Sequence, residues 1–450
     1  MKKLLLVSAN QMKSPYPVYP LGVSYLHTYL EKHLKDMDVK IFDFILHDFA
    51  DYENILKTYQ PDYVGLSIRN VDDVNITVQQ SFINHYKKIV EYIRKYSDAV
   101  VIAGGSGYSI YPKQMYEFIK PDYGIYGEGE ARFCELLQAL ESNNDYSQIS
   151  NLVYRHNGQL FFNKNEQSLK SIDVCFDDKI LDYYWQHSGM LNVQTKRGCP
   201  FKCIYCTYPI IEGHKVRTLN ASVIADTLED LSRNRGINYI FFTDSIFNID
   251  NAFNYELADI IIRKKLDIQW GAYFNFCNID EKLLSYMQKA GLKHIEFGTD
   301  TLSESMLKNY NKPFKVSDIM HISDICARLG IDYAHFLILA GYGETEATIN
   351  ETFNNARLLE KTVFFPFIGL RIYPGTKLHE IALNEGKINA ADDLLRPTYY
   401  ISDKVDTSLF KAKAKETGKR WIFPEDDLTA IMQKMRARNK KGPLWEFLIQ

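Results

Sequence analysis

The chain has 450 residues, of which 46% are hydrophobic and 24% charged, and its net charge is −3 at pH 7. This length suffices for two or three domains, each with its own core. A near-neutral chain lacks the basic field that favours nucleic acid, and no apolar stretch reaches transmembrane length, so we expect neither kind of partner. The N-terminal run lacks the pattern of a signal peptide, and the four cysteines outside 199–206 show no pairing spacing. Both features predict a reducing cytoplasm, while association with a membrane surface stays open.

Residues 1–141 alternate short apolar strands with segments of helix length. Helices are expected over LGVSYLHTYLEKHL, over 76–95, near 113–119 and over ARFCELLQAL. The strands between them are KLLLVSA, VKIFDF, YVGLSI, AVVIAGG and DYGIYG. This alternation predicts a doubly wound parallel sheet of the Rossmann-like or flavodoxin-like kind.

Glycine and polar residues follow three of these strands. They are Ser67, Arg69 and Asn70, then Gly104, Gly105 and Ser106, and then Gly127, Glu128 and Gly129. Open α/β sheets bind ligands beyond the carboxyl ends of their strands. Glycines there let the backbone approach a bulky ligand closely, and backbone N–H groups can meet phosphate or amide oxygens. Together these loops predict a nucleotide-like or tetrapyrrole cofactor.

The rest of the chain divides into three further parts. Residues 142–188 form a linker, in which NLVYRHNGQLFFN alternates across His-Asn-Gly like a hairpin. Residues 189–376 start a second α/β alternation that predicts a partial barrel of six βα units. Its strands are LNVQTK, INYIFFTDS, IQWGAYFNF, HIEFGTD, YAHFLILAG and VFFPFIGLRIYP. Residues 377–450 are expected to form a small, mainly helical capping domain.

Three cysteines lie close together in RGCPFKCIYCTYP, at Cys199, Cys203 and Cys206. The Cys-x3-Cys-x2-Cys spacing can fold three thiolates around one point, one ligand fewer than a cubane iron–sulfur cluster needs. An open coordination position is typical of a metal site that performs chemistry. A structural zinc site would need a fourth Cys or His near the loop. The triplet therefore predicts a [4Fe–4S] cluster with one open iron.

The cysteine loop and the strand ends that follow it resemble the radical S-adenosylmethionine (SAM) enzymes, over roughly residues 190–375. The resemblance implies that SAM chelates the open iron and is cleaved to a 5′-deoxyadenosyl radical by an electron from a flavodoxin or ferredoxin. Asp244 and Asn248 stand where the family commonly has Gly-Gly-Glu. The positions that the resemblance assigns to SAM are Tyr205, Asp244, Asn248, Asn275, Glu296, Gly341, Glu344 and Arg371.

Residues 1–140 resemble the cobalamin (B12)-binding module of the B12-dependent radical SAM subfamily, through PVYPLGVSYLHTYLE, AGGSGYSIYP and YGEGEARF. Many B12 proteins supply a histidine ligand from an Asp-x-His-x-x-Gly signature after the first strand. Here the chain reads SANQMKSPYP at that place, so the signature is absent. The resemblance thus implies cobalamin without a histidine ligand, held by the nine residues at the three strand ends. Arg69 is expected to face the lower side of the corrin.

A class B radical SAM methyltransferase is the function that this combination implies. Such an enzyme moves a methyl group from SAM through methylcobalamin to an unactivated carbon. A B12-dependent cyclase or rearrangement enzyme is the alternative, and a methylthiotransferase or a non-catalytic cobalamin or redox sensor are further ones. The substrate stays open between a small molecule, a lipid and a peptide, and no catalytic acid or base is assigned.

Overall fold

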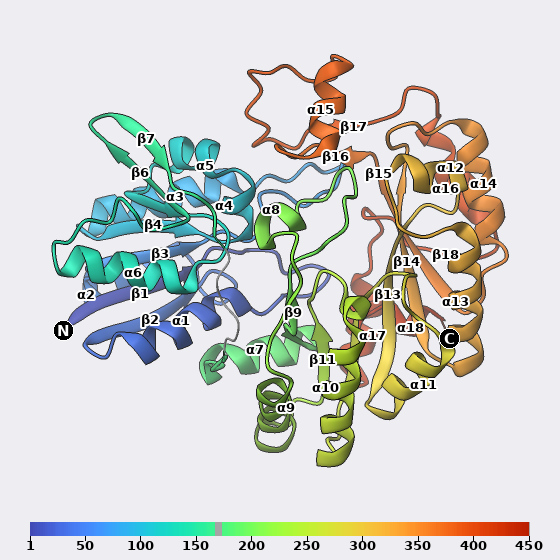
Figure 1. Ribbon diagram of the computed structural model, residues 1–450, viewed down its shortest axis with the longest axis horizontal. Coiled ribbons are helices and arrows are strands. Elements are labelled where there is room, and N and C mark those ends of the chain that lie inside the picture. The colour runs from blue at the N-terminus through green and yellow to red at the C-terminus, as the bar shows by residue number, and fades with distance from the viewer. Residues whose placement is uncertain (167–172, 450) are drawn as a thin grey trace.

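The computed structural model describes residues 1–166 and 173–449, and it places an α/β domain beside a barrel-like domain (Figure 1). The first sheet has seven strands in the order β2-β1-β3-β4-β5-β6-β7. Strands β1 to β5 are parallel, which confirms the predicted doubly wound sheet. The bounds are β1 (Lys2–Ser8), β2 (Met37–Asp43), β3 (Tyr63–Ser67), β4 (Val100–Gly104), β5 (Tyr123–Ile125), β6 (Leu152–His156) and β7 (Gln159–Phe162).

Helices cover both faces of this sheet because its strands are apolar on both sides. Leu5 and Val7 of β1 pack in one core, whereas Leu4 and Leu6 pack in another, as a period of two requires. The helices are α1 (Leu21–His33), α2 (Phe49–Tyr59), α3 (Ile83–Tyr96), α4 (Ser106–Ile110), α5 (Pro112–Ile119) and α6 (Glu130–Glu141).

Two local expectations change in this domain. The helix predicted over 76–95 is wrong at its start, since α3 begins at Ile83. The Asn75 side chain accepts a hydrogen bond from the Thr77 amide, and Gln79 has a φ of 50°, so this stretch turns instead. The hairpin predicted in the linker forms as β6 and β7, and it extends the N-terminal sheet in antiparallel fashion.

The second sheet has seven strands in the order β18-β15-β14-β13-β12-β11-β8, all parallel. Six of them are the predicted barrel strands. The bounds are β8 (Leu191–Val193), β11 (Tyr239–Phe242), β12 (Gln269–Phe274), β13 (Leu292–Asp300), β14 (Asp332–Leu339), β15 (Thr362–Ile368) and β18 (Arg420–Trp421). Helices α9 (Ala221–Glu229), α10 (Asn251–Lys264), α11 (Glu281–Lys289), α13 (Val316–Leu329) and α14 (Glu346–Ala356) connect these strands.

Two predicted strands are each divided in the structure. After β8, the chain forms β9 (Lys196–Arg197), which pairs with β10 (Arg217–Thr218) outside the barrel sheet. After β15, it forms β16 (Leu370–Arg371), which pairs with β17 (Tyr399–Tyr400). Gly369, with a φ of 76°, provides the turn between β15 and β16.

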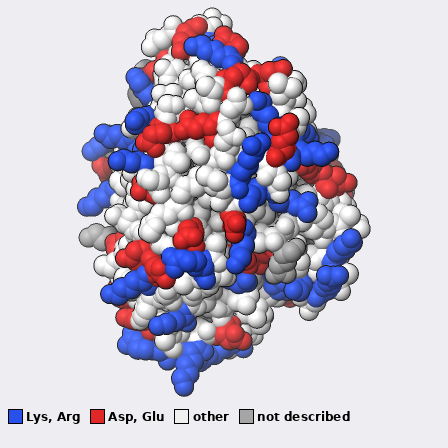
Figure 2. Space-filling view, turned by 90° about the vertical axis from the view of Figure 1, so that its right-hand side faces the viewer, with Lys and Arg blue, Asp and Glu red and all other residues white. Residues whose placement is uncertain are grey.

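The C-terminal segment is largely helical, with α15 (Lys377–Asn384), α16 (Phe410–Glu416), α17 (Thr429–Ala437) and α18 (Glu446–Ile449). It does not stand apart as a cap, because β18 adds to the barrel sheet and α18 contacts β14 and β15 (Figure 1). Across the described part of the chain, no helix is both long and apolar enough to cross a bilayer. Figure 2 shows acidic and basic side chains intermingled over most of the barrel-side face.

Candidate active site

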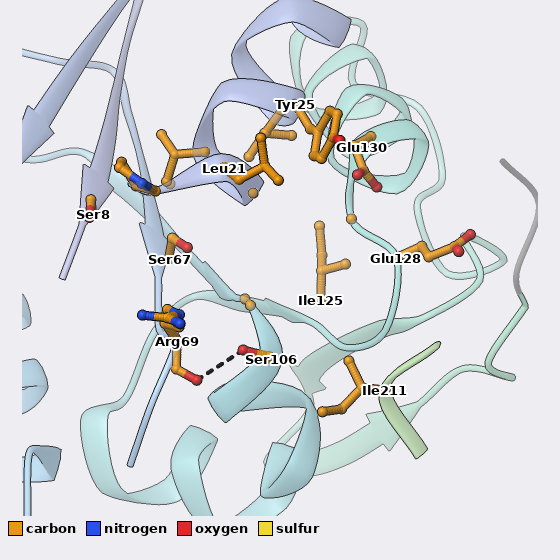
Figure 3. Close-up of a pocket in the computed structure, with 18 of the residues that line it drawn as sticks. Ser8, Leu21, Tyr25, Ser67, Arg69, Ser106, Ile125, Glu128, Glu130 and Ile211 are labelled. Atoms are coloured by element: carbon orange, nitrogen blue, oxygen red, sulfur yellow. Dashed lines mark hydrogen bonds between the residues drawn. The ribbon is translucent and has the colours of Figure 1, made fainter. Parts of the chain in front are cut away.

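A cavity of about 490 Å³ lies between the two domains, at the carboxyl ends of the N-terminal strands. Its barrel side includes Tyr208, Ile211 and Glu212 of α8 (Tyr208–Glu212), the helix that directly follows the cysteine loop. All nine residues predicted to bind cobalamin line it: Ser67, Arg69, Asn70, Gly104, Gly105, Ser106, Gly127, Glu128 and Gly129. Figure 3 shows Arg69 and Ser106 on one side of the cavity and Glu128 and Glu130 across from them.

The glycines after β4 allow this loop to pack against the end of β3. Gly105 has a φ of 99°, and a Cβ there would lie 2.5 Å from the Ile68 carbonyl oxygen. The Gly107 amide donates to that same oxygen at 2.9 Å, and Ser106 Oγ donates to the Arg69 carbonyl at 2.9 Å (Figure 3). The loop therefore fixes the backbone of Arg69 at the cavity wall.

A buried charge cluster joins the domains at the opposite wall. Arg197 of β9 pairs with Glu130 at 2.7 Å and lies 3.7 Å from Glu128, which also pairs with Arg217. Burial alone would raise the pKa of Glu130, but Arg197 holds it below the ordinary value. The sequence did not point to Arg197 or Arg217, because their acidic partners lie far away along the chain.

The cysteine loop runs between β9 and α8. Cys199 is buried, while Cys203 and Cys206 are half-buried. Gly198 has a φ of 90°, and a Cβ there would lie 2.2 Å from the Lys215 carbonyl oxygen, so only glycine fits before Cys199. Burial raises the pKa of the Cys203 thiol, and the charge of the neighbouring Lys312 opposes this effect.

These thiols fit a sulfur-liganded cluster by donor chemistry, since three soft donors lie on one loop beside a cation. Within the described ranges, no three His, Cys, Asp or Glu side chains converge as ligands of a single metal ion. The cavity fits a large planar cofactor, since glycines and residues of both domains line it. These residues would hold the cluster and the corrin, respectively.

Asp244, one of the residues assigned to SAM, is fully buried and bonded within the protein. Its carboxylate accepts hydrogen bonds from the Thr195 amide at 2.6 Å and the Lys196 amide at 3.0 Å. The Lys196 ammonium lies 3.2 Å from its other oxygen. Asp244 therefore ties the end of β11 to the segment that leads into the cysteine loop.

Arg371 has a similar internal role between the domains. Its guanidinium pairs with Asp72 at 2.9 Å and donates to the carbonyl oxygens of Ile372 and Leu394, each at 2.8 Å. Both charged side chains are almost completely buried. The pair thus links the loop after β3 to β16 of the barrel.

Asn248 and Asn275 bond to each other beyond β11 and β12. The Asn275 amide donates to Asn248 Oδ1 at 3.0 Å, and Asn248 Nδ2 donates to the Cys277 carbonyl at 2.7 Å. Among the described residues, Asn275 Nδ2 is buried with no hydrogen-bond partner. This pair therefore leaves one buried donor at the carboxyl edge of the barrel.

Tyr205, beside Cys206, donates its hydroxyl hydrogen bond to Asp300. Lys312 pairs with the same carboxylate at 2.8 Å, and its charge also acts on Cys203 and Cys206. The sequence did not single out Asp300 or Lys312. No local pattern in the sequence pairs these two residues. The structure shows that Asp300 ends β13 with a φ of 62°.

Glu344 lies in the glycine-rich loop after β14 and is fully buried. The Gly341 amide donates to its Oε2 at 3.3 Å, whereas Oε1 has no partner within the described residues. Burial raises the pKa of Glu344 to about 8. Gly341 is required here because a Cβ would lie 2.0 Å from the Tyr310 hydroxyl.

Glu296 lies in the barrel lumen, as the alternation predicts. Its neighbours Ile295 and Phe297 pack in the outer core with the surrounding helices. Glu296 Oε1 accepts a hydrogen bond from Trp445 Nε1 at 3.0 Å. The eight residues assigned to SAM are thus spread over several strand ends, and none of them lines the 490 Å³ cavity.

Comparison with known proteins agrees with this architecture. Residues 8–137 match the model of the B12 binding domain, and residues 193–356 match that of the radical SAM superfamily. The chain belongs to the cobalamin-dependent radical SAM enzymes. The resemblance stated from the sequence is therefore confirmed, together with cobalamin, SAM and an iron–sulfur cluster as the cofactors of the family.

Three proteins illustrate the similarity within this family. An uncharacterized methyltransferase of Pyrococcus horikoshii is 27% identical over 87% of this chain and 86% of its own length. The tryptophan 2-C-methyltransferase of Streptomyces laurentii is 24% identical over 82% of this chain and 72% of its own. The radical SAM methyltransferase TsrM from Kitasatospora setae, solved with cobalamin and a [4Fe–4S] cluster, has a TM-score of 0.88 at 21% identity, covering 100% of this chain and 98% of that one.

Proposed function

We propose that this enzyme is a C-methyltransferase that carries a methyl group from SAM through cobalamin to a carbon atom of its substrate. The observation that carries the proposal is the shared wall of the 490 Å³ cavity. This cavity lies at the strand ends of the B12-binding domain, and α8, which begins two residues after Cys206, forms part of it. A corrin held there would lie next to the cysteine loop, so SAM bound at the cluster would be close enough to the corrin for methyl transfer.

When bound, cobalamin supplies a metal centre that can carry a methyl group, and the cluster supplies the electron that cleaves SAM. The chain's own residues bind, orient and exclude water. Cys199, Cys203 and Cys206 provide the three thiolate ligands. Tyr205, Asn248, Asn275, Gly341 and Glu344 are proposed to face SAM. Glu296, which the resemblance also assigned to SAM, is bonded to Trp445 and is proposed to act elsewhere in the barrel. Asp244 and Arg371 act on that site through the loops that they fix.

The nine cavity residues are proposed to bind the corrin. Arg69 extends from the end of β3. Burial raises the pKa of the cavity residue Tyr208, and the charge of Arg69 opposes this effect. If Arg69 faces the corrin as expected, its positive charge would disfavour a ligand to the cobalt from this side and would destabilise the more electrophilic oxidised metal. No histidine is needed for this arrangement.

The partners follow from the same chemistry. The cluster needs a one-electron donor, for which a flavodoxin or a ferredoxin is suited. We place the enzyme in the cytoplasm, where exposed thiols stay reduced. The substrate is a small molecule, a lipid or a peptide.

The test uses protein reconstituted anaerobically with cobalamin and iron–sulfur cluster, SAM labelled in its methyl group, and a reductant. We expect the label to appear on protein-bound cobalamin. With a substrate, the product mass increases by one CH2 unit for each methyl transferred. Cleavage of SAM without labelled cobalamin would instead indicate the cyclase or rearrangement chemistry, and intact SAM would indicate a sensor.

A methylthiotransferase is disfavoured because only two cysteines, Cys134 and Cys175, precede the triplet. That class needs further cysteine ligands for a second cluster. Cys134 is buried in α6 of the N-terminal domain, whereas Cys175 is exposed just before α7 (Asp178–Ser188). A product that gains sulfur as well as a methyl group would contradict this conclusion.

A further inference from the structure

The barrel lumen beside this site contains open space. Gly298 of β13 is two residues beyond Glu296, and a Cβ there would meet no atom of the described chain within 4 Å. The Tyr273 side chain of β12 is 36% exposed, although desolvation raises the pKa of its phenol well above the ordinary value. A ring that is both accessible and surrounded by protein faces an internal space rather than the outer surface.

Aromatic rings form much of the wall of this lumen. Tyr273 packs edge-on against Phe241 of β11, with ring centres 5.0 Å apart. Phe336 of β14 and Phe365 of β15 stack at 4.9 Å. Tyr16, from the loop after β1, packs into the same cluster as Phe241. Aromatic walls favour a flat, apolar occupant that can stack against them or meet them edge to face.

The C-terminal segment closes the opposite end of the lumen. The strand register places Tyr273, Glu296, Ala334 and Val363 in one row on four adjacent strands. Trp445 is buried against Ala334 and Val363, near the start of their strands, and its indole N–H donates to Glu296. The lumen is therefore closed at this row, with Glu296 beneath the open space at Gly298.

The residue after Trp445 anchors this closure. Glu446 accepts a hydrogen bond from the Tyr239 hydroxyl and lies 3.1 Å from His294 Nδ1. Gly442, with a φ of 105°, packs against the Tyr239 ring, and its amide donates to the Gly189 carbonyl at 3.0 Å. These contacts hold the Trp445 ring in a fixed position below Glu296.

The two ends of the lumen carry opposite polarity. Burial raises the pKa of the Tyr16 and Tyr273 phenols. The Glu296 carboxylate at the closed end adds to this effect, and the charge of Arg69 at the cobalamin cavity opposes it. Tyr16 and Tyr273 therefore lie within range of both the cation at the corrin side and the carboxyl group at the floor.

We propose that the barrel lumen is the substrate chamber, that its occupant is a flat, largely apolar ring system, and that Glu296 accepts a hydrogen bond from an N–H or O–H group at the end of that ring system far from the corrin. This inference rests on the proposed function, because it takes the space between corrin and floor as the place of the substrate. It makes Glu296 a specificity-determining residue and Trp445 its positioning residue.

The test compares two ring systems that differ in one donor, 2-naphthol and 2-methoxynaphthalene. Binding of each to the enzyme reconstituted with cobalamin and cluster is measured by calorimetry. A hydrogen bond to the Glu296 carboxyl group is expected to favour 2-naphthol by about tenfold. Equal affinity for the two probes, or no binding of either at about 1 mM, would overturn the proposal.

Variants then test whether Glu296 causes the preference for 2-naphthol. In Glu296→Leu combined with Trp445→Phe, both members of the Trp445–Glu296 hydrogen bond are removed, so the indole N–H is not left unpaired. We expect the preference to fall to within about twofold in this double variant and to persist in Trp445→Phe alone. An unchanged preference in the double variant contradicts the proposal, and so does its loss in Trp445→Phe. If the double variant does not fold, Glu296→Gln replaces it and is expected to reduce the preference.

A third variant tests the chamber itself. Gly298→Val fills the open space, and we expect it to weaken binding of both probes by tenfold or more. Unchanged binding of both would place the occupant elsewhere. The labelled-cobalamin experiment on the unmodified enzyme needs no substrate. If cobalamin becomes labelled but the enzyme does not prefer 2-naphthol, only the substrate chamber is refuted. If the enzyme prefers 2-naphthol but cobalamin is not labelled, only methyl transfer is refuted.

Discussion

The two domains place their polar residues in different ways. In the N-terminal domain, all nine residues predicted to bind cobalamin at the three strand ends line one cavity. In the barrel, Asp244 and Arg371 also follow strands, yet each is buried and bonded to protein groups. Strand ends of an open sheet face a crevice by topology, whereas the barrel mouth is crossed by loops that need their own internal anchors. A polar residue at a strand end is thus a stronger sign of ligand contact in the open sheet than in the barrel.

The largest expected effect lies in the barrel, at the cysteine loop. Cys199→Ser removes one of three thiolate ligands, and we expect loss of the [4Fe–4S] cluster and of SAM cleavage. Iron and sulfide content and the visible absorption of reconstituted protein measure this. Cys175→Ser is the control, because Cys175 is exposed and outside the loop. Wild-type iron content in Cys199→Ser would refute the cluster assignment.

Lys196→Met tests whether Asp244 is an internal anchor. This change leaves the fully buried Asp244 carboxylate without its cation, and we expect a loss of about 3–5 kcal/mol in the free energy of unfolding. Urea denaturation measures it. In the exposed pair Lys377–Glu380, Lys377→Met should cost less than about 1 kcal/mol. If Lys196→Met loses SAM binding but keeps its stability, Asp244 acts in the SAM site and not as an internal anchor.

The Arg371–Asp72 pair tests the contact between the domains. A double-mutant cycle with Arg371→Met and Asp72→Leu should give a coupling energy of about 0.5–3 kcal/mol. We also expect the double variant to keep most of the affinity for SAM, measured by equilibrium binding. If the double variant loses SAM binding although it is more stable than the single variants, Arg371 contacts SAM directly.

Glu344 gives a pH dependence with a definite sign. Its pKa is raised from 4.5 to about 8 in the folded protein, so folding favours its protonated form. The resulting stabilisation is complete below pH 4.5 and is lost as the pH rises toward 8. Stability of Glu344→Gln should therefore fall less than that of the wild type over this interval, as thermal unfolding at several pH values would measure. Parallel curves for the two proteins would contradict the burial of an ionisable group here.

Arg69→Ala tests the cavity side of the comparison and has the smallest expected effect on stability. We expect a changed absorption spectrum of bound cobalamin, because the cation beside the corrin is removed. Arg94→Ala is the matched control, since Arg94 pairs with Asp122 on the surface of the same domain and should leave the spectrum unchanged. An unchanged spectrum in Arg69→Ala would show that Arg69 does not face the corrin.

Much of the fold was accessible from the sequence. The strands of the first sheet, six of the seven strands of the second sheet, and nine of the residues that line the cavity follow from local apolar runs and the glycine and polar residues at their ends. The divided strands were missed because β9 and β16 leave the barrel sheet to pair with residues farther along the chain. The anchors Arg197, Lys196 and Asp72 were missed because each carries a charge whose partner lies far away in the sequence.

The sequence by itself determined the cofactor set. Three cysteines at fixed spacing are a local signal of an open iron–sulfur cluster, glycines at strand ends are one of a nucleotide-like or tetrapyrrole cofactor, and the resemblance to B12-dependent radical SAM enzymes implied SAM and cobalamin. The tertiary structure alone decided where the substrate chamber closes. Trp445 meets Glu296 across 149 positions of the chain, and Tyr239 meets Glu446 across 207. No local pattern encodes such contacts, because they form only once the barrel strands have aligned and left a lumen that the C-terminal segment can fill.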